Sequence, residues 1–566
     1  MAKVPTKPAI RSSVASLRDM PRCSVLVIGG GINGIATFRD LALQGVDVIL
    51  VERADYCSGA SAASSHMIHG GIRYLENGEF RLVRESVQER NWLLGAAPHY
   101  VKPLQTTVPI FSTFSGIVSA PLRFLTHKAG KPNERGALLI KIGLTLYDSF
   151  SRGGGKVARH RFRGRKKSLA RLPKLNSGVK YTATYFDASV HDPERLALDV
   201  LADALEAGAH ARSSNYVESI GATKDGVRVR DVISGTEFTI AADVVVNTTG
   251  PWTDETNHGL GAPSTFMGGT KGSHIVVDNQ ELHDACAGGE VFFENDDGRI
   301  VLIFPLKGRV MIGTTDLEAD LSVDSVCTEQ EIDYFIELVS QVFPTIALNR
   351  SQIVFSFSGV RPLPKHDDMQ PGFVSRDYRI ERGALAGSPL LSLVGGKWTT
   401  FRALAAHLAQ DALDILGRER SVDTTGVPIG GGKAYPTSDA QRADWLRANA
   451  TSSVDEKRTQ QLLERYGTRA GAFIATIGAQ PDTALRNTAV VTRRELVHIC
   501  EREHVVHLDD LVLRRTSLAF TGELTADLLT ELAEVVGGVV GWSKTDREAE
   551  VARTRGILLS RHRVAL

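Results

Sequence analysis

The stretch SVLVIGGGINGIATFRDLALQGVDVILVE (24–52) decides the fold of the N-terminal half of this chain. Its first residues form a short apolar, β-branched run, which is typical of a strand buried on both faces. A glycine-rich turn follows, then a segment that reads as a helix ending at Gly45, and then a second buried strand ending at Glu52. Strand, helix and strand within about thirty residues predict a βαβ unit and therefore a parallel sheet.

The turn GGGING (29–34) contains the spacing G-x-G-x-x-G directly between the first strand and the helix. Glycines here permit a tight turn and let the backbone approach a pyrophosphate, while the helix N-terminus supplies N–H donors and a positive dipole. Glu52 follows Gly34 by eighteen residues, where a carboxylate can accept hydrogen bonds from a ribose. These features predict a dinucleotide site that includes Gly29, Gly31, Asn33, Gly34 and Glu52.

Two later segments favour FAD over NAD as the dinucleotide. The chain returns to the sheet only at DVVVNTTGPW (243–252), after a predicted antiparallel meander that can cover the adenine side. A further glycine turn, Gly395-Gly396, opens a late helix that can close over the flavin end. Contacts dispersed this widely suit a long, permanently held cofactor better than an exchangeable nicotinamide.

Composition sets the limits for these predictions. With 566 residues, 42% hydrophobic and 23% charged, the chain is long enough for two or three domains. A formal net charge of +1 gives no overall reason to expect a nucleic-acid binder. Five widely spaced cysteines without a CxxC pair predict buried, reduced thiols. The N-terminus has no apolar signal region, and no stretch reaches the roughly 18 apolar residues that span a bilayer, so we expect a cytoplasmic location.

Hydrophobic periodicity changes along the chain. Residues 270–315 read as β-strands, Thr328 and Glu331 form a capping box before a helix, and 424–436 reads as a linker. The predicted parts are a discontinuous FAD-binding domain (22–100, 181–262 and 355–420), a substrate-binding domain (101–180 and 263–354), and a C-terminal helical domain (437–566).

Several motifs then resemble the FAD-dependent glycerol-3-phosphate dehydrogenase family. The motifs are SSHMIHGGIRYLENGEFRLVRES, KGSHIVV, MIGTTD, SGVRPL, SRDYRI and GGKWTTFRALAAH, followed by the C-terminal DDLVLRRTSLAF and GWSKTDREAE. The resemblance implies an α/β (overall α+β) fold with a Rossmann-like domain of the glutathione-reductase/amino-acid-oxidase type. It also implies FAD-dependent oxidation of sn-glycerol 3-phosphate at C2 to dihydroxyacetone phosphate, with hydride transfer to flavin N5. The expected electron acceptor is a membrane quinone, although some relatives use oxygen.

The resemblance assigns roles to residues that contact the substrate phosphate. Arg73 and Arg376 are predicted phosphate ligands, since a guanidinium binds phosphate bidentately, and Tyr74 adds a hydroxyl donor. Lys397 is predicted to neutralise substrate or flavin charge. Taken alone, each would be read as an ordinary surface residue.

The same resemblance assigns the proton chemistry. His274 is the predicted general base, because imidazole titrates near neutral pH. Arg361 is predicted to hold the substrate hydroxyl, so that the two residues share the task, and Thr314 is predicted to hydrogen-bond the substrate.

Further cofactor contacts are expected in the serine-rich loop after the second strand and at the later turns. These are Ser61, Ser64, Ser65, His69, Val217, Thr249, Gly250, Gly396 and Thr399. His66 and His69 have helical spacing for a metal, but no local carboxylate or cysteine joins them, so no metal is predicted. His66 stands where many relatives carry lysine, and we expect it to alter the charge at the pocket entrance.

Residues 149–186 hold eleven Lys/Arg and no Asp/Glu. This block is either a solvated surface or, with the apolar segment 111–125, a peripheral attachment to anionic lipid through 152–180 on the inner face of the cytoplasmic membrane. A homodimer is a further predicted partner.

Competing functions remain open at this point. They are oxidation of a longer polyol phosphate such as erythritol phosphate, an amine or amino-acid oxidase, a non-catalytic flavin scaffold, and a nucleic-acid binder. Intact His274, Arg361 and Lys397 argue against the scaffold, and the run of arginines suited to phosphate argues against an amine substrate.

Overall fold

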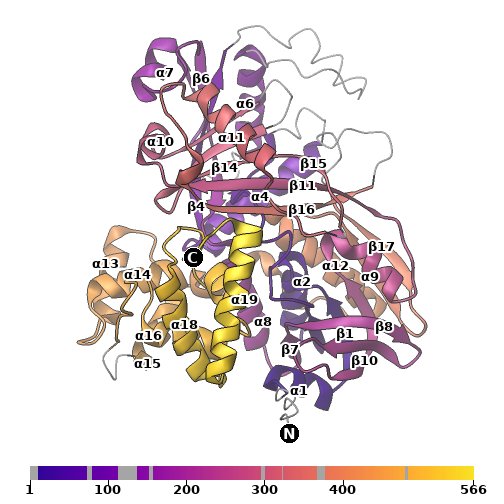
Figure 1. Cartoon of the computed structure of the whole chain (residues 1–566). Coiled ribbons are helices and arrows are strands. Elements are labelled where there is room, and N and C mark those ends of the chain that lie inside the picture. Colours follow the sequence, from indigo (N-terminus) through magenta and orange to yellow (C-terminus); the bar gives the residue numbers. More distant parts are fainter. Residues whose placement is uncertain are drawn as a thin grey trace.

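The computed structural model describes residues 10–72, 79–111, 137–151, 157–294, 300–321, 323–365, 377–477 and 482–566 (Figure 1). Within these residues the chain forms two sheets and a group of C-terminal helices. In Figure 1 one sheet lies above the other, and the C-terminal helices lie beside the lower one. This mixed α/β arrangement is the fold class predicted from the sequence.

The first sheet contains the βαβ unit predicted from residues 24–52. Its strand order is β17-β18-β10-β1-β2-β7, and every neighbouring pair except β17–β18 is parallel. The strands are β1 (Arg22–Ile28), β2 (Val48–Val51), β7 (Ala211–Ser214), β10 (Glu237–Asn247), β17 (Arg379–Ala384) and β18 (Pro389–Val394). β8 (Val217–Thr223) and β9 (Gly226–Asp231) join the first half of β10 in the predicted antiparallel meander. The prediction of a parallel sheet is confirmed.

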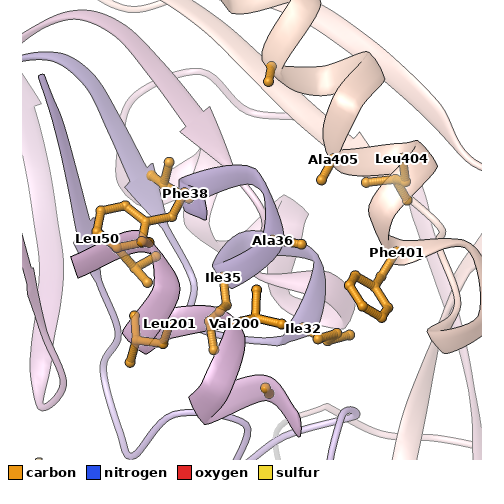
Figure 2. Packing of buried hydrophobic residues seen from close by; sticks show 14 of the residues in the cluster. Ile32, Ile35, Ala36, Phe38, Leu50, Val200, Leu201, Phe401, Leu404 and Ala405 are labelled. Atoms are coloured by element: carbon orange, nitrogen blue, oxygen red, sulfur yellow. The ribbon is translucent and has the colours of Figure 1, made fainter. Parts of the chain in front are cut away.

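Helices cover the first sheet and supply most of its core. They are α1 (Ser12–Asp19), α2 (Ile32–Leu43), α8 (Pro193–Glu206), α9 (Thr253–Gly259) and α12 (Phe401–Ile415), with short turns η1 (Gly250–Trp252) and η4 (Trp398–Thr400). Figure 2 shows α2 between α8 and α12, with Ile35 beside Val200 and Phe38 beside Leu50. Each such buried side chain contributes about 1.5–3 kcal/mol, so this packing holds the start of α2 in place.

The second sheet is mostly antiparallel. Its order is β15-β11-β14-β13-β12-β4-β6-β3, with β16 paired to β11 and β5 paired to β6. The strands are β3 (Met67–Ile68), β4 (Val101–Ile110), β5 (Arg161–Gly164), β6 (Tyr181–Val190), β11 (Met267–Val277), β12 (Glu290–Glu294), β13 (Ile300–Leu306), β14 (Arg309–Gly313), β15 (Leu317–Glu318) and β16 (Ile353–Pro364).

Three strands of this sheet lie wholly or mostly outside the ranges predicted for it. β3, β6 and β16 fall in segments assigned by sequence to the FAD-binding domain, yet β3 pairs with β6, β6 with β4, and β16 with β11. Alternation of polar and apolar residues predicts a strand but does not identify its partner, which depends on long-range hydrogen bonds.

Helices also accompany the second sheet. They are α4 (Phe80–Ala96), α6 (Ala137–Ser151), α7 (Arg165–Arg171), α10 (Gln280–Ala285) and α11 (Glu329–Val342), with the turn η2 (Arg350–Gln352). The predicted capping box before α11 is confirmed, since the Glu331 side chain accepts from the Thr328 backbone N–H at 2.8 Å and the Thr328 hydroxyl accepts from Glu331 N–H at 3.3 Å.

The last part of the chain is helical, as predicted. It contains η5 (Thr424–Gly426), η6 (Gly430–Gly432), α13 (Asp439–Asn449), α14 (Glu456–Tyr466), η7 (Gly467–Arg469), α15 (Ala470–Ile477), α16 (Arg493–Arg502), α17 (Leu508–Asp510), a π-turn η8 (Leu511–Arg515), α18 (Ala526–Val540) and α19 (Lys544–His562). Buried residues of α16–α19 share one apolar cluster with the second sheet, in which Leu528 and Leu532 of α18 join Phe304 and Phe355, whereas those of α13–α15 form separate clusters. The helices α16–α19 therefore pack on the second sheet rather than forming an isolated unit.

The segment 424–436 is not the free linker that its glycines suggested. Ile429 N–H donates to the Ala96 carbonyl at 2.9 Å, and Gly430 N–H donates to both carboxylate oxygens of Asp203 at 3.2 Å. A Cβ on Gly431 would lie 1.9 Å from the Tyr466 carbonyl oxygen. The glycines are present because backbones pack closely here, so the linker prediction is wrong.

All five cysteines are buried and free, as expected for reduced thiols. Among the helices in the described part of the chain, none has the length and apolar character required to cross a membrane.

Candidate active site

The glycine turn between β1 and α2 is shaped by backbone contacts that exclude side chains. Gly29 has φ +108°, and a Cβ there would lie 2.8 Å from the Thr248 carbonyl carbon. A Cβ on Gly34 would lie 1.9 Å from the Gly29 carbonyl oxygen. Because neither position tolerates a side chain, the N-terminus of α2 comes close against β1, where a helix N-terminus favours a phosphate.

The carboxyl ends of β1 and β10 meet at this turn. The Thr248 hydroxyl donates to the carbonyl oxygens of Ile28 at 2.9 Å and Gly29 at 3.0 Å. Next to it, the Thr249 hydroxyl donates to Asn247 Oδ1 at 2.7 Å, and Gly250 has φ +63°. Ligands of parallel sheets bind outside the carboxyl ends of the strands, so Thr249 and Gly250 lie where the sequence predicted cofactor contacts.

Glu52 joins the end of β2 to the same turn. Its carboxylate accepts from Gly30 N–H at 2.6 Å and from Ala54 N–H at 2.8 Å. Val217 N–H donates to the Glu52 carbonyl oxygen at 2.7 Å, so two of the predicted cofactor residues are held together. Burial raises the pKa of Glu52. Each carboxylate oxygen keeps a second lone pair, which can accept from a ribose hydroxyl.

The late glycine turn meets the first one at Asn33. Gly396 has φ +107°, and a Cβ there would lie 2.6 Å from Asn33 Nδ2. The Oδ1 atom of Asn33 is buried without a hydrogen-bond partner, which costs about 1–3 kcal/mol unless a ligand donates to it. Thr399 is buried in the η4 turn that follows. Two adjacent glycine turns and the unsatisfied acceptor Asn33 Oδ1 are features that fit a dinucleotide such as FAD.

The serine-rich loop connects the two glycine turns. Ser61 Oγ accepts from Ile32 N–H at 3.0 Å, at the first turn of α2, and the indole N–H of Trp398 donates to the Ser61 carbonyl at 3.0 Å. Ser64 Oγ accepts from His66 N–H at 3.3 Å. Ser61 therefore lies at a helix N-terminus that attracts anions.

His274 lies inside the second sheet rather than on its surface. It is opposite Gly313 of β14 and Phe357 of β16, and its ring stacks on Phe357 with centroids 4.7 Å apart. A Cβ on Gly313 would lie 2.1 Å from His274 Cδ2, so this glycine makes room for the ring. The Nε2 atom is 2.8 Å from Ser65 Oγ, whereas Nδ1 is buried without a partner.

The surroundings keep His274 uncharged. Burial lowers its pKa well below the ordinary value, and the positive charge of Arg361 lowers it further. A neutral imidazole with a hydrogen-bonded Nε2 is able to accept a proton. Ser65 thus links the serine-rich loop to His274, the predicted base.

Arg361 is held in one orientation by the segment that follows β14. Its Nη1 donates to Asp316 Oδ1 at 2.6 Å, and its Nη2 donates to Thr314 Oγ1 at 2.9 Å. A Cβ on Gly272 would lie 2.3 Å from Arg361 Nη2, so this glycine makes room for the guanidinium. Arg361 and Thr314, each predicted to contact the substrate, are thus hydrogen-bonded to one another. The sequence reasoning did not single out Asp316, although it is the last residue of the MIGTTD motif.

Gly70 of the HGG segment contacts a buried polar cluster that the sequence did not reveal. Gly70 N–H donates to Asp187 Oδ1 at 3.0 Å, and a Cβ on Gly70 would lie 2.1 Å from the Tyr147 hydroxyl. Asp187 in turn accepts from Tyr147 at 2.6 Å and from Arg90 at 2.7 Å. These three residues come from α4, α6 and β6, and no local sequence signal connects them.

Lys397 is attached to α4, the helix that carries Arg90, and His69 precedes Gly70 in the chain. The Lys397 ammonium donates to Ser86 Oγ at 2.6 Å, which attaches the η4 turn to α4. His69 is half-buried between β3 and Gly70. Arg73, Tyr74 and Arg376 lie outside the described residues, as do 112–136.

His66 does not act as sequence reasoning expected. It is buried with a left-handed φ of +55°, its Nδ1 donates to the Val190 carbonyl at 2.9 Å, and its ring contacts Phe520. Burial lowers its pKa to about 4. His66 therefore leaves this position uncharged, and its ring lies buried against Phe520 rather than exposed at an entrance.

Comparison with known proteins assigns this arrangement to a family. Residues 24–402 match the model of FAD dependent oxidoreductases, and residues 422–547 match that of the C-terminal domain of alpha-glycerophosphate oxidase. A glycerol-3-phosphate dehydrogenase of Synechocystis sp. is 34% identical over 94% of this chain and 95% of its own. A D-erythritol 1-phosphate dehydrogenase of Brucella abortus is 33% identical over 87% and 94%. The solved glycerol-3-phosphate dehydrogenase of Bacillus halodurans, complexed with FAD, has the same fold with a TM-score of 0.73, 23% identity, and coverage of 96% and 97%.

Substituting Gly34→Ala is expected to abolish flavin retention, because the new Cβ would meet the Gly29 carbonyl and force the turn open. Flavin absorbance per protein chain in the purified variant measures this. Gly556→Ala in α19 is the matched control, since nothing lies within 4 Å of its Cβ. Full flavin content in Gly34→Ala would refute the assignment of this turn to the cofactor.

Proposed function

This chain belongs to the FAD-dependent oxidoreductases of the glycerol-3-phosphate dehydrogenase type, and from that premise we propose that it oxidises sn-glycerol 3-phosphate at C2 to dihydroxyacetone phosphate and that its electron acceptor is a quinone. The observation that carries the proposal is the arrangement of side chains around β11 in the second sheet. His274 is hydrogen-bonded to Ser65 of the serine-rich loop, Arg361 is hydrogen-bonded to Thr314, and the charge of Arg361 acts on His274. FAD, when bound, supplies a hydride acceptor.

The residues divide the removal of two hydrogens from the substrate. The hydroxyl proton goes to His274, which is neutral because it is buried, while the C2 hydrogen leaves as hydride. Arg361, held by Asp316 and Thr314, stabilises the negative charge that develops on the substrate oxygen. Arg73, Tyr74 and Arg376 are assigned to the phosphate, and Lys397 is assigned to supply further positive charge.

A second candidate substrate is erythritol phosphate. A relative of almost the same identity is named a D-erythritol 1-phosphate dehydrogenase. Both substrates present a phosphate and a secondary alcohol, so the same clamp and the same base serve either one.

Adding glycerol 3-phosphate to the yellow protein without oxygen is expected to bleach the flavin. D-erythritol 1-phosphate, tested at the same concentration, is expected to bleach it more slowly. The measurement is the loss of flavin absorbance in stopped flow. Bleaching by the erythritol phosphate alone would replace our choice of substrate by the second candidate.

The pH dependence of kcat/KM tests the role of His274. Because the folded pKa lies well below 6.5, the base stays deprotonated as the pH falls through 6.5, and the acid limb is expected below that value. His274→Gln is expected to lower the rate about 10²–10⁴-fold, whereas His283→Gln on α10 serves as the control and leaves the profile unchanged. An acid limb at or above pH 6.5 would contradict His274 as the base.

We further propose a peripheral membrane attachment at α6, β5 and α7. Figure 1 shows α6 and α7 at one end of the molecule. Leu138, Ile142 and Leu146 of α6 are 46%, 58% and 41% exposed and lie four residues apart, so they share one helix face. The basic side chains of the neighbouring segment are exposed, among them Arg159, Arg161, Arg165, Lys166, Lys167 and Arg171. An apolar stripe beside a basic surface suits an anionic lipid interface.

The double variant Lys166→Glu/Lys167→Glu is expected to bind vesicles of anionic lipid about 30-fold more weakly, at about 1 kcal/mol for each basic residue. Co-sedimentation with vesicles of anionic and of neutral lipid measures the affinity. Lys457→Glu/Lys544→Glu, which changes two exposed lysines of the C-terminal helices, is the matched control. Equal binding of the two double variants would exclude this surface.

A further inference from the structure

Asp55 forms the most heavily bonded buried carboxylate between the first sheet and the C-terminal helices. Its side chain is completely buried and accepts from both Arg514 and Arg515, with the Arg515 Nη2 bond at 2.8 Å. Asn215 Nδ2 donates to it at 3.1 Å. The two arginines lie about 460 residues further along the chain, so this cluster is a purely tertiary feature.

The loop that carries Asp55 shapes the adenosine side of the cofactor cradle. Ala54 N–H donates to the Glu52 carboxylate at 2.8 Å, and Cys57 N–H donates to the Gly30 carbonyl at 2.9 Å. On its other side, Tyr216 N–H donates to the Ala54 carbonyl at 3.0 Å. A shift of the loop 52–57 would therefore move the Glu52 carboxylate and the glycine turn together.

The arginines are themselves fixed within the C-terminal part. Arg515 Nη2 also donates to the Glu503 carbonyl at 2.7 Å, and Arg514 Nη2 donates to Asp510 Oδ1 at 2.8 Å. The same Asp510 oxygen accepts from the Tyr216 hydroxyl at 2.7 Å. The segment 503–515 thus forms a rigid support behind the loop 52–57.

The charges in this cluster are paired with one another. Three buried carboxylates, Asp55, Asp509 and Asp510, contact Arg514 or Arg515, and Asp509 also pairs with Arg553. Although burial raises the pKa of Asp55, Arg515 and Arg514 lower it to about 2, so the carboxylate is ionised. Removing one member leaves a buried charge without its partner, which favours a shift of the loop.

We propose that Arg514 and Arg515 are positioning residues for FAD. These two arginines hold Asp55, and Asp55 fixes the loop 52–57. The loop in turn sets the positions of Glu52 and Gly30, which determine the affinity for the adenosine half of the cofactor. This gives the C-terminal helices a function in cofactor retention. The inference rests on the placement of the ribose and pyrophosphate at Glu52 and the glycine turn, and it is independent of the substrate.

The test compares full-length variants in FAD titrations of the apoprotein, followed by quenching of flavin fluorescence. Arg515→Gln and Asp55→Asn are expected to weaken FAD binding about tenfold or more, a size typical of coupling between sites. Arg515→Lys keeps the charge but loses the forked pair of donors, so an intermediate loss is expected. Arg469→Gln is the matched control, because Arg469 also joins the C-terminal part to the first domain, through Asp199, Asp203 and Glu206 of α8, away from the loop.

The proposal would be overturned if Arg515→Gln and Asp55→Asn lowered the melting temperature but left the FAD affinity unchanged. The two variants would then behave as the control Arg469→Gln does. A second measurement uses the unmodified protein and so does not depend on variant folding. Because coupling is reciprocal, FAD binding must slow amide hydrogen exchange in 503–515 more than in 456–477. Equal exchange in 503–515 with and without FAD would also overturn it. If glycerol 3-phosphate failed to bleach the flavin, the proposed reaction would be contradicted. The FAD titrations and the hydrogen exchange would not be changed by that outcome.

Discussion

Close contact between backbones at the carboxyl ends of β1 and β10 is the constraint on which the site depends. Gly34 lies against the Gly29 carbonyl, and Thr248 hydrogen-bonds that same carbonyl from the neighbouring strand. No residue with a side chain fits the first contact, and α2 can start close to the sheet only because of it. Glu52 and Ser61 accept hydrogen bonds from N–H groups of this turn, so the positions of both depend on this contact.

In the second sheet, a predicted base and a cation lie among apolar strands. Small residues opposite the functional ones make this possible, with Gly313 beside the His274 ring and Gly272 beside the Arg361 guanidinium. Phe357 covers the imidazole and Asp316 neutralises the guanidinium. The result is a neutral histidine that is hydrogen-bonded to Ser65 of the serine-rich loop, and an arginine oriented by Asp316.

Buried charge joins parts of the chain that are far apart in sequence. Asp55 with Arg514 and Arg515, and Asp187 with Arg90, each lie behind a loop whose backbone is part of the site. Such pairs cost desolvation energy and are poor sources of stability, but they define geometry, because each ion is tolerated only in one arrangement. The C-terminal helices therefore take part in the construction of the site rather than forming a separate appendage.

Local sequence determined those features whose physics is local. The βαβ unit follows from the apolar run, the glycines and the acid in 24–52, and the capping box of Thr328 and Glu331 follows from residues three apart. The motifs around His274, Thr314 and Arg361 identified residues that the sheet does bring together. Tertiary structure alone decided that β6 and β16 join the second sheet and that His66 is neutral. It also decided that the segment 424–436 packs against neighbouring backbone, and that Asp55 pairs with Arg514 and Arg515. Strand partners, burial and ion pairing depend on groups brought together from distant parts of the chain, and no local pattern records which of them will meet.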